Sequence, residues 1–128
     1  MKVINDLKLG QSIEAAAGKY AGITTGTDGV PYALILLDAE PATELNWRDA
    51  LAWAAEQSGD LPTRVESAML FANLKSEFKP TWHWTNTQYS DYNAWFQYFG
   101  YGDQYGGSKS AELRARAVRR LPLDSSIL

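Results

Sequence analysis

The sequence contains no cysteine and a single histidine, His83. The missing thiols exclude disulfide bonds, a thiolate metal site and a cysteine nucleophile. No stretch approaches the roughly 18 apolar residues of a membrane span, and the first residues lack the apolar segment of a signal peptide. We therefore expect a soluble protein that is made in the cytoplasm without a signal peptide and does not insert into a membrane.

A strong charge of either sign is missing as well. The net charge of −3 gives no basic field for phosphates, so a nucleic-acid partner is not expected. Cationic residues gather near the end of the chain, at Lys109 and between Arg114 and Arg120. We interpret these arginines as a solvated or salt-bridged face of the last strand.

Recognisable catalytic patterns are also absent. His83 has no nearby nucleophile or ligand set, so we interpret it as a solvent-facing or hydrogen-bonded strand residue. Carboxylates are plentiful, but no spacing identifies a glycosidase pair. We therefore predict that the chain is not an enzyme and needs neither a metal ion nor another cofactor.

Aromatic residues, in contrast, are concentrated in one stretch. Ten of the sixteen lie between Trp82 and Tyr105, with short polar residues among them. Rigid amphipathic rings provide contact area while small polar side chains adapt around them, a mixture typical of recognition surfaces. The stretch indicates a binding module, and 128 residues are enough for a single domain with its own core.

The first third of the chain predicts a β-hairpin. Residues 19–23 and 32–37 have the composition of strands, and Asp28-Gly29 between them is a strong turn signal. The second strand is apolar at both parities, which indicates a central strand covered on both faces. Residues 1–17 hold only scattered apolar positions, so both an edge strand and an oligomer contact, as an assembly segment, remain open.

Two helices follow. Apolar residues recur at helical spacing over 47–57, with Asn46 as N-cap and Gly59 ending the helix. Thr63 and Glu66 have the spacing of a capping box that starts the second helix. The apolar face predicted for the second helix consists of Val65, Met69 and Ala72, widened by Leu70 and Leu74.

After Pro80 the pattern becomes that of strands and loops. The predicted elements are strands over 81–85, 94–99 and 113–120, loops over 86–93 and 100–107, and a tail over 122–128. In the first of these strands Trp82 and Trp84 share one side, because side chains alternate.

Several short motifs occur in an order that resembles one known family. These motifs are Trp47-x-x-Ala50, Leu61-Pro62-Thr63-Arg64-x-Glu66, Trp84-Thr85-Asn86-Thr87, Ala94-Trp95 in a strand ending at Gly100, and Arg116-Ala117-Val118-Arg119. Together they resemble bacterial and phage domains of unknown function related to the C-terminal domain of a collagen-like bacterial adhesin. The resemblance covers roughly residues 18–121.

This resemblance implies an α+β, C-type-lectin-like fold of the formylglycine-generating-enzyme type. Two helices would pack on a mostly antiparallel sheet whose N- and C-terminal strands pair, and a long loop-rich region would carry the ligand surface. The chain departs from the family where Gly59-Asp60 replaces a Trp-Arg pair and Ala117 a frequent cysteine. Related oxidases need cysteines that are missing here, and Glu40-Pro41-Ala42 does not match the calcium motif of true C-type lectins.

Strand parity and the family pattern divide the aromatic stretch. They place Trp82, Trp84, Trp95 and Phe99 in the core. The remaining aromatic and polar residues are the candidate ligand-binding residues, namely Tyr89, Asp91, Tyr92, Asn93, Phe96, Tyr98, Tyr101, Asp103 and Tyr105.

Because relatives of this fold include phage tail receptor-binding proteins, the resemblance implies a phage or prophage protein placed in the virion tail. The predicted function is a non-enzymatic module that recognises a cell-surface protein or glycan through loops 86–108. The alternative is a structural or assembly protein whose aromatic loops form a homo-oligomer interface.

Overall fold

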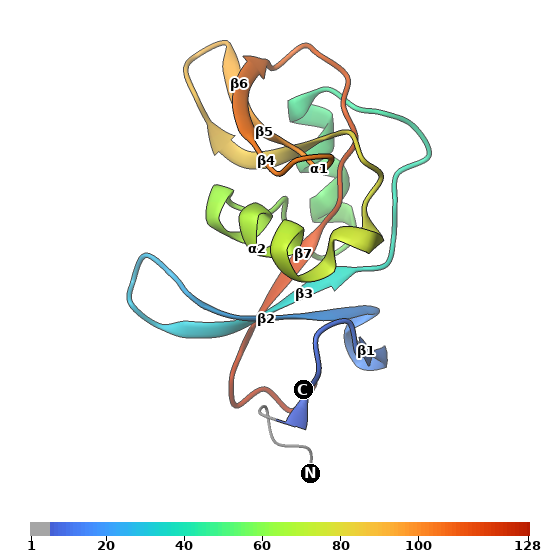
Figure 1. The fold of residues 1–128 in the computed structure, drawn as a ribbon, viewed down its shortest axis with the longest axis vertical. Coiled ribbons are helices and arrows are strands. Elements are labelled where there is room, and N and C mark those ends of the chain that lie inside the picture. Colours follow the sequence, from blue (N-terminus) through green and yellow to red (C-terminus); the bar gives the residue numbers. More distant parts are fainter. Residues whose placement is uncertain (1–5) are drawn as a thin grey trace.

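The computed structural model describes residues 6–128 and has an α+β architecture (Figure 1). Within these residues two antiparallel sheets and two α-helices are present. The strands are β1 (Ser12–Ile13), β2 (Gly18–Thr25), β3 (Pro31–Leu37), β4 (Trp82–Gln88), β5 (Asn93–Tyr98), β6 (Gln104–Ser108) and β7 (Val118–Pro122). The helices are α1 (Trp47–Glu56) and α2 (Arg64–Leu74), with short 3-10 helices η2 (Glu14–Ala16) and η3 (Lys75–Glu77).

The first sheet has the strand order β1-β2-β3-β7. The predicted central strand is confirmed, because β3 pairs with β2 and β7 and its two faces belong to different apolar clusters. Ile35 points into one cluster and Leu34 into the other, and both are fully buried. The predicted pairing of the first and last strands is wrong. The first strand, β1, has two residues and pairs with β2, whereas the last strand, β7, pairs with β3.

The turn between β2 and β3 forms as predicted. The Gly29 N–H donates to the Gly26 carbonyl at 2.9 Å, and the Val30 N–H donates to Asp28 Oδ1 at 3.0 Å. Gly29 has a φ of +81°, a conformation in which glycine carries no Cβ penalty. The Asp-Gly signal therefore identifies this turn from local chemistry alone.

Both predicted helix starts are confirmed. Asn46 Oδ1 accepts the Asp49 N–H at 2.9 Å, and α2 begins with a full capping box. In that box the Glu66 N–H donates to Thr63 Oγ1 at 3.1 Å, and the Thr63 N–H donates to Glu66 Oε1 at 2.8 Å.

The predicted apolar face of α2 is confirmed only in part, because Leu70 and Leu74 are buried but Val65 and Ala72 are exposed. Val65 is 65% exposed, and the face toward the sheets carries Glu66, Ser67, Leu70 and Leu74. Because two polar residues, Glu66 and Ser67, lie on that face, the apolar period identified only part of it.

The second sheet, β4-β5-β6, confirms the strands predicted over 81–85 and 94–99 as β4 and β5, whereas β6 and the end of β4 lie where loops were predicted. It forms the upper part of the molecule in Figure 1. Glycine composition misled the prediction here, because the glycines of β6 make room for rings rather than for a loop. A Cβ on Gly106 would lie 2.7 Å from the Tyr89 ring, and one on Gly107 would lie 2.7 Å from the Phe96 ring.

The C-terminal strand starts later than predicted. Leu113 and Arg114 form only isolated bridges, with Leu45 and His83, and β7 runs on to Pro122. The predicted tail is not free: Leu123, Ile127 and Leu128 pack against the core. In the N-terminal segment, β1 confirms the edge-strand alternative, while residues 1–5 lie outside the described part of the chain.

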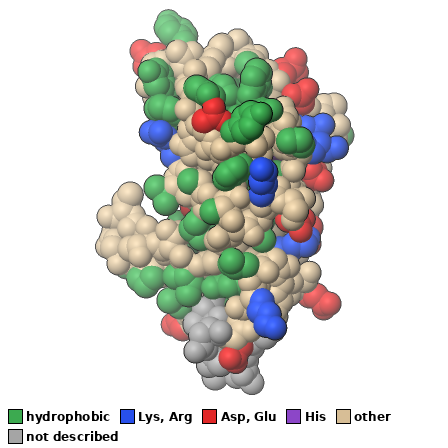
Figure 2. Space-filling model, in the orientation of Figure 1, with side chains coloured by type: hydrophobic (Ala, Val, Ile, Leu, Met, Phe, Trp, Pro, Cys, Tyr) green, Lys and Arg blue, Asp and Glu red, His purple; other side chains and the backbone are tan. Residues whose placement is uncertain are grey.

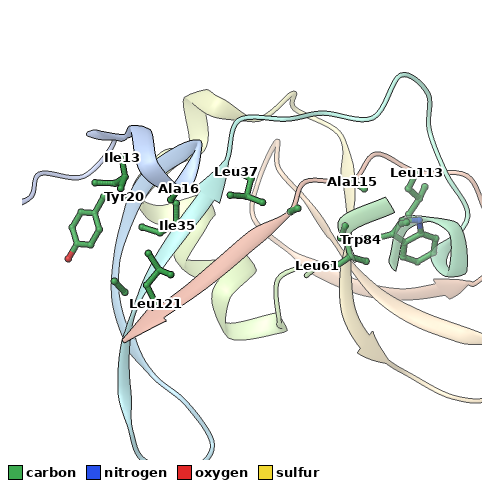
Figure 3. Close-up of a cluster of buried hydrophobic side chains, with 14 of the residues drawn as sticks. Ile13, Ala16, Tyr20, Ile35, Leu37, Leu61, Trp84, Leu113, Ala115 and Leu121 are labelled. Atoms are coloured by element: carbon green, nitrogen blue, oxygen red, sulfur yellow. The ribbon is translucent and has the colours of Figure 1, made fainter. Parts of the chain in front are cut away.

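One apolar cluster connects the two sheets. Figure 3 shows it extending from Ile13 and Tyr20, past Leu121, to Trp84 and Leu113. The second sheet is therefore anchored on the first through packed side chains. Within residues 6–128 no helix combines the length and apolarity needed to cross a membrane.

Candidate ligand-binding site

Strand register brings four aromatic side chains together on one face of the second sheet, and Tyr101, in the turn after β5, joins them. Trp82 lies opposite Tyr98, and Phe96 lies opposite Tyr105. The ring centroids are 6.0 Å apart for Tyr105 and Phe96, and 5.6 Å apart for Phe96 and Trp82. The chain of rings continues from Trp82 to Tyr98 at 6.4 Å and from Tyr98 to Tyr101 at 5.7 Å. We call these five residues the aromatic patch.

The patch is open to solvent. Tyr101 is 84% exposed, Tyr105 50% and Trp82 47%, while Phe96 and Tyr98 are partly buried between their neighbours. Hydrophobic side chains gather on the upper part of the molecule in Figure 2, the end that holds the second sheet. Exposed apolar surfaces of this kind mark interaction sites in proteins.

The same face is covered at its other end. Trp84 is fully buried there, and its Nε1–H donates to the Leu45 carbonyl at 2.8 Å. Trp47, the first residue of α1, donates its Nε1–H to the Thr85 carbonyl at 2.8 Å. The start of α1 and the strand-like residues around Leu45 therefore cover the Trp84 end, and the patch is what they leave open.

Helix α2 covers the opposite face of the sheet. Gln97 is fully buried, and its Nε2–H donates to the Ser67 carbonyl at 2.9 Å. Gln104 extends this contact, because its amide donates to Gln97 Oε1 at 2.7 Å and to the Arg64 carbonyl at 2.8 Å. These hydrogen bonds hold β5 and β6 in place behind the patch.

His83 belongs to this supporting layer. Its ring packs edge-on against Phe78 and Phe99, with centroids 5.2 and 4.9 Å away, and these two phenyl rings stack at 4.0 Å. Burial lowers the pKa of His83 to about 4, so the ring is neutral near neutral pH. Nδ1 lies 3.2 Å from the Thr81 carbonyl and must carry the proton to donate there. The solvent-facing alternative is wrong, and the hydrogen-bonded one is confirmed.

The patch has few polar groups. The Tyr105 hydroxyl donates to Asp103 Oδ2, which raises the pKa of Tyr105. The second carboxylate oxygen of Asp103 is buried and has no hydrogen-bond partner within residues 6–128. The tyrosine hydroxyls add groups that both donate and accept hydrogen bonds.

The predicted site residues separate into three groups. The first group lies together at the aromatic patch and consists of Phe96, Tyr98, Tyr101, Asp103 and Tyr105.

Two of the residues predicted for the core, Trp84 and Phe99, are buried as expected.

Tyr89 lies on the opposite face, against Trp95, at a centroid distance of 4.9 Å. Trp95, predicted for the core, is only partly buried. The Arg64 guanidinium carbon lies 3.5 Å from the centroid of that ring, a cation–π contact. Tyr89 therefore belongs to a separate stack and not to the patch.

Asp91, Tyr92 and Asn93 lie at the turn between β4 and β5. Lys109 ties this turn down, since its Nζ donates to the Asp91 carbonyl at 2.8 Å and its N–H donates to the Tyr92 carbonyl at 2.9 Å. Tyr92 is 82% exposed. The length of β5, roughly 20 Å, separates this turn from Tyr98, so the structure does not bring these three residues to the patch.

Trp82 is the residue that sequence reasoning missed. Parity placed it correctly on the side of Trp84, but the cover over that face ends before Trp82, the first residue of β4. Its position two residues after Pro80, at a strand end, was the available signal that it could be exposed.

A charged network joins α2 to the first sheet. Arg120 donates from Nε to Glu66 Oε2 at 2.6 Å, from Nη2 to Glu66 Oε1 at 2.8 Å and from Nη1 to Asp60 Oδ2 at 2.9 Å. Burial alone would raise the pKa of Glu66, but hydrogen bonds from Arg120, Tyr32 and Thr63 lower it overall. Burial and the bond to Glu66 raise the pKa of Tyr32 to about 12. The predicted salt-bridged role fits Arg120.

Arg116, by contrast, is buried, so the solvated or salt-bridged face predicted for it is wrong. It donates to two backbone carbonyls, those of Glu77 at 2.6 Å and Leu37 at 2.9 Å. Both arginines therefore hold the fold together.

Beside the Arg120 network lies a groove of about 710 Å³ between the β2–β3 turn and the segment that follows β7. Its walls include Val30, Pro31 and Leu123, and Tyr32 and Arg120 lie at its polar side. Because Glu66 is ion-paired and hydrogen-bonded, it is not available as a general base. Within residues 6–128 no three His, Cys, Asp or Glu side chains gather as a metal site would require.

Comparison with models of known protein families gave no match. No curated protein matched the chain either.

Proposed function

We propose that this chain is a non-enzymatic ligand-binding module that recognises a cell-surface protein or glycan through the aromatic patch. The observation that carries the proposal is a continuous series of five rings on a sheet face that the rest of the fold leaves uncovered. Aromatic residues are enriched at the centres of interfaces, where they bury much area with little loss of side-chain entropy.

The chemistry of the patch suits a ligand with flat apolar faces and hydroxyl groups. The rings offer stacking surfaces, and the hydroxyls of Tyr98, Tyr101 and Tyr105 can exchange hydrogen bonds with a sugar or a backbone amide. The Asp103 carboxylate is the one formal charge we assign to the site, so an uncharged ligand surface is expected. Because β5 is fixed from behind by the Gln97 contact, binding orders few additional groups.

The proposal also includes a C-type-lectin-like fold and a phage or prophage origin with a place in the virion tail. Support comes from the order of the motifs along the chain and from the two capped helices that precede the ligand-bearing sheet. The ligand surface proposed here is a sheet face, rather than the loops that the resemblance implies.

The test replaces Tyr98 and Tyr101 together by alanine. Binding to a panel of bacterial cells and to a glycan array should fall at least about tenfold, since two stacking surfaces are removed. Tyr92→Ala is the matched control, because Tyr92 is as exposed as Tyr101 but lies at the other end of β5. If the double variant stays folded and binds as tightly as the control, the patch is not the binding site.

The alternative function, a structural or assembly protein with the patch as a homo-oligomer interface, rests on the same exposed rings. Light scattering separates the two: the alternative requires the Tyr98→Ala, Tyr101→Ala variant to have a smaller mass than the unmodified protein. An unchanged mass with lost ligand binding would support the binding module.

A further inference from the structure

The outer edge of β6 is a second feature that the proposed binding function does not use. Within residues 6–128, β6 pairs with β5 alone and ends the second sheet. Its sequence, Gln104-Tyr105-Gly106-Gly107-Ser108, contains no lysine and no proline, the residues that commonly protect an edge strand from pairing with another chain.

The other sheet edges are short, partly occupied or irregular; the outer side of β2 beyond β1 has no strand partner within residues 6–128, but its register shifts between Tyr20 and Gly22. The outer edge of β4 bonds to Arg114, whose carbonyl accepts the Trp84 N–H at 3.1 Å and whose N–H donates to the Trp82 carbonyl at 3.2 Å. The Val118 end of β7 exchanges two hydrogen bonds with Asp60, and β1 has only two residues. The unprotected edge of β6 therefore stands out among the described strands.

The direction of the backbone groups in β6 follows from the bonds that flank it. The Tyr98 N–H donates to the Asp103 carbonyl at 2.8 Å, and the Lys109 N–H donates to the Tyr92 carbonyl at 2.9 Å. In an antiparallel pair alternate residues direct their N–H and C=O groups to the same neighbour. Residues 105 and 107 therefore face β5, and residues 104, 106 and 108 direct their backbone groups outward.

We propose that this edge pairs with the β6 edge of a second copy of the chain, antiparallel and with Gly106 opposite Gly106. The two copies would then form one six-stranded sheet. Gln104 of each copy lies opposite Ser108 of the other, so outward donors meet outward acceptors along the whole strand. The Ser108 carbonyl already accepts the Ala111 N–H at 3.0 Å, and its second lone pair remains available.

A second copy fits this edge better than an unrelated extended peptide does, because the side chains are self-complementary in that register. Tyr105, the one bulky residue of β6, lies opposite Gly107 of the other copy on the patch face. On the other face two Gly106 residues meet, and the Tyr89 ring of each copy lies over its own Gly106. The two-fold axis passes between the two Gly106 residues, perpendicular to the sheet.

The arrangement has a consequence that rests on the proposed function. A two-fold axis perpendicular to the sheet places both aromatic patches on the same face of the six-stranded sheet. Two linked sites on one surface bind a repetitive ligand, such as a cell-surface glycan, more tightly than either site alone.

The test measures mass by light scattering over a series of protein concentrations, for the unmodified chain, Ser108→Pro and Ser108→Ala. Proline removes the outward N–H of residue 108, whereas alanine keeps it. We expect a dimer for the unmodified chain and Ser108→Ala, and a dissociation constant raised at least about tenfold for Ser108→Pro. A monomeric unmodified chain, or a Ser108→Pro dimer of unchanged affinity, would overturn the proposal.

Amide hydrogen exchange gives a readout that needs no variant. The backbone N–H groups of Gly106 and Gln104 should become protected from exchange as the concentration of the unmodified protein rises, while exchange of the Tyr92 backbone N–H should not change. Protection independent of concentration, or binding of an added extended peptide without dimerisation, contradicts pairing with a second copy. The Tyr98→Ala, Tyr101→Ala variant should still dimerise, so failure of the ligand proposal and failure of this one are distinguishable.

Discussion

Protonation of His83 should limit the acid stability of the fold. The ring is 3% exposed and sits between Phe78 and Phe99, with Arg116 and Arg114 close enough to disfavour a further positive charge. Burial, with a smaller contribution from these arginines, lowers the pKa of His83 to about 4. The folded protein therefore keeps this ring neutral at pH values where a free histidine is charged.

The direction and size of the effect follow from linkage between folding and proton binding. Between pH 6.5 and about 4 the unfolded chain binds a proton at His83 that the folded chain does not bind. The free energy of unfolding therefore falls as the pH falls through this range and is unaffected by His83 above it. The two pKa values correspond to a loss of about 3 kcal/mol.

This loss can be measured by urea denaturation at a series of pH values from 7.5 to 4, with tryptophan fluorescence, including that of the buried Trp84, as the signal for unfolding. His83→Asn is the matched variant, because asparagine can donate to the Thr81 carbonyl but does not titrate. The cavity in the variant should lower its stability at every pH by a similar amount. The contribution of His83 then appears as the difference between the two pH dependences.

The expected result is a steeper decline for the unmodified protein between pH 6.5 and 4, with the two curves parallel above pH 7. Carboxylates titrate in both proteins and cancel in the comparison. Parallel curves over the whole range, or a histidine proton resonance that titrates near pH 6.5 in the folded protein, would refute the conclusion that burial keeps His83 neutral.

Two further predictions concern the scaffold. Glu66→Gln should lower the free energy of unfolding by about 3 kcal/mol in chemical denaturation, because it removes the buried carboxylate that both Arg120 and the N-terminal cap of α2 use. A decrease smaller than that expected for an exposed ion pair would contradict this role. Gly107→Ala should cost about 1–3 kcal/mol, because the new Cβ would collide with the Phe96 ring, whereas Val65→Ala on the exposed face of α2 should change stability by less than about 0.5 kcal/mol. Equal thermal midpoints for these last two variants would show that β6 tolerates a side chain at position 107.

Features that depend on neighbours in sequence could be predicted. The Asn46 cap, the Thr63–Glu66 capping box and the Asp28-Gly29 turn each need only a few consecutive residues, and each forms as expected. The α+β class, which the resemblance implied, is confirmed.

Features that depend on what covers a surface could not be predicted. Whether Trp82 is buried depends on where the cover over the Trp84 end stops, which no parity argument contains. Glycines at 106 and 107 are typical of a loop. Here glycine is required by residues distant in the sequence, because the rings of Tyr89 and Phe96 occupy the space that a Cβ would take. About half of the predicted site residues lie in the patch. Asp91, Tyr92 and Asn93 do not, because the turns at the two ends of β5 lie a strand length apart.

The buried polar residues of α2 were hidden for the same reason. Glu66 and Ser67 reach partners far along the chain, Arg120 and the Gln97 amide. A periodicity argument assigns polar residues to solvent and therefore misses those that lie on the buried face.

The alternation along β5 has an evolutionary consequence. Gln97 anchors the sheet to α2, while Phe96 and Tyr98, its immediate neighbours, face the open side. If the patch binds the ligand as we propose, we expect position 98 to exchange one ring for another and alter specificity, whereas position 97 is held by its buried hydrogen bond. Insertion or deletion of one residue in β5 would exchange the two rows and destroy both roles, so we expect variation here to proceed by substitution at fixed length.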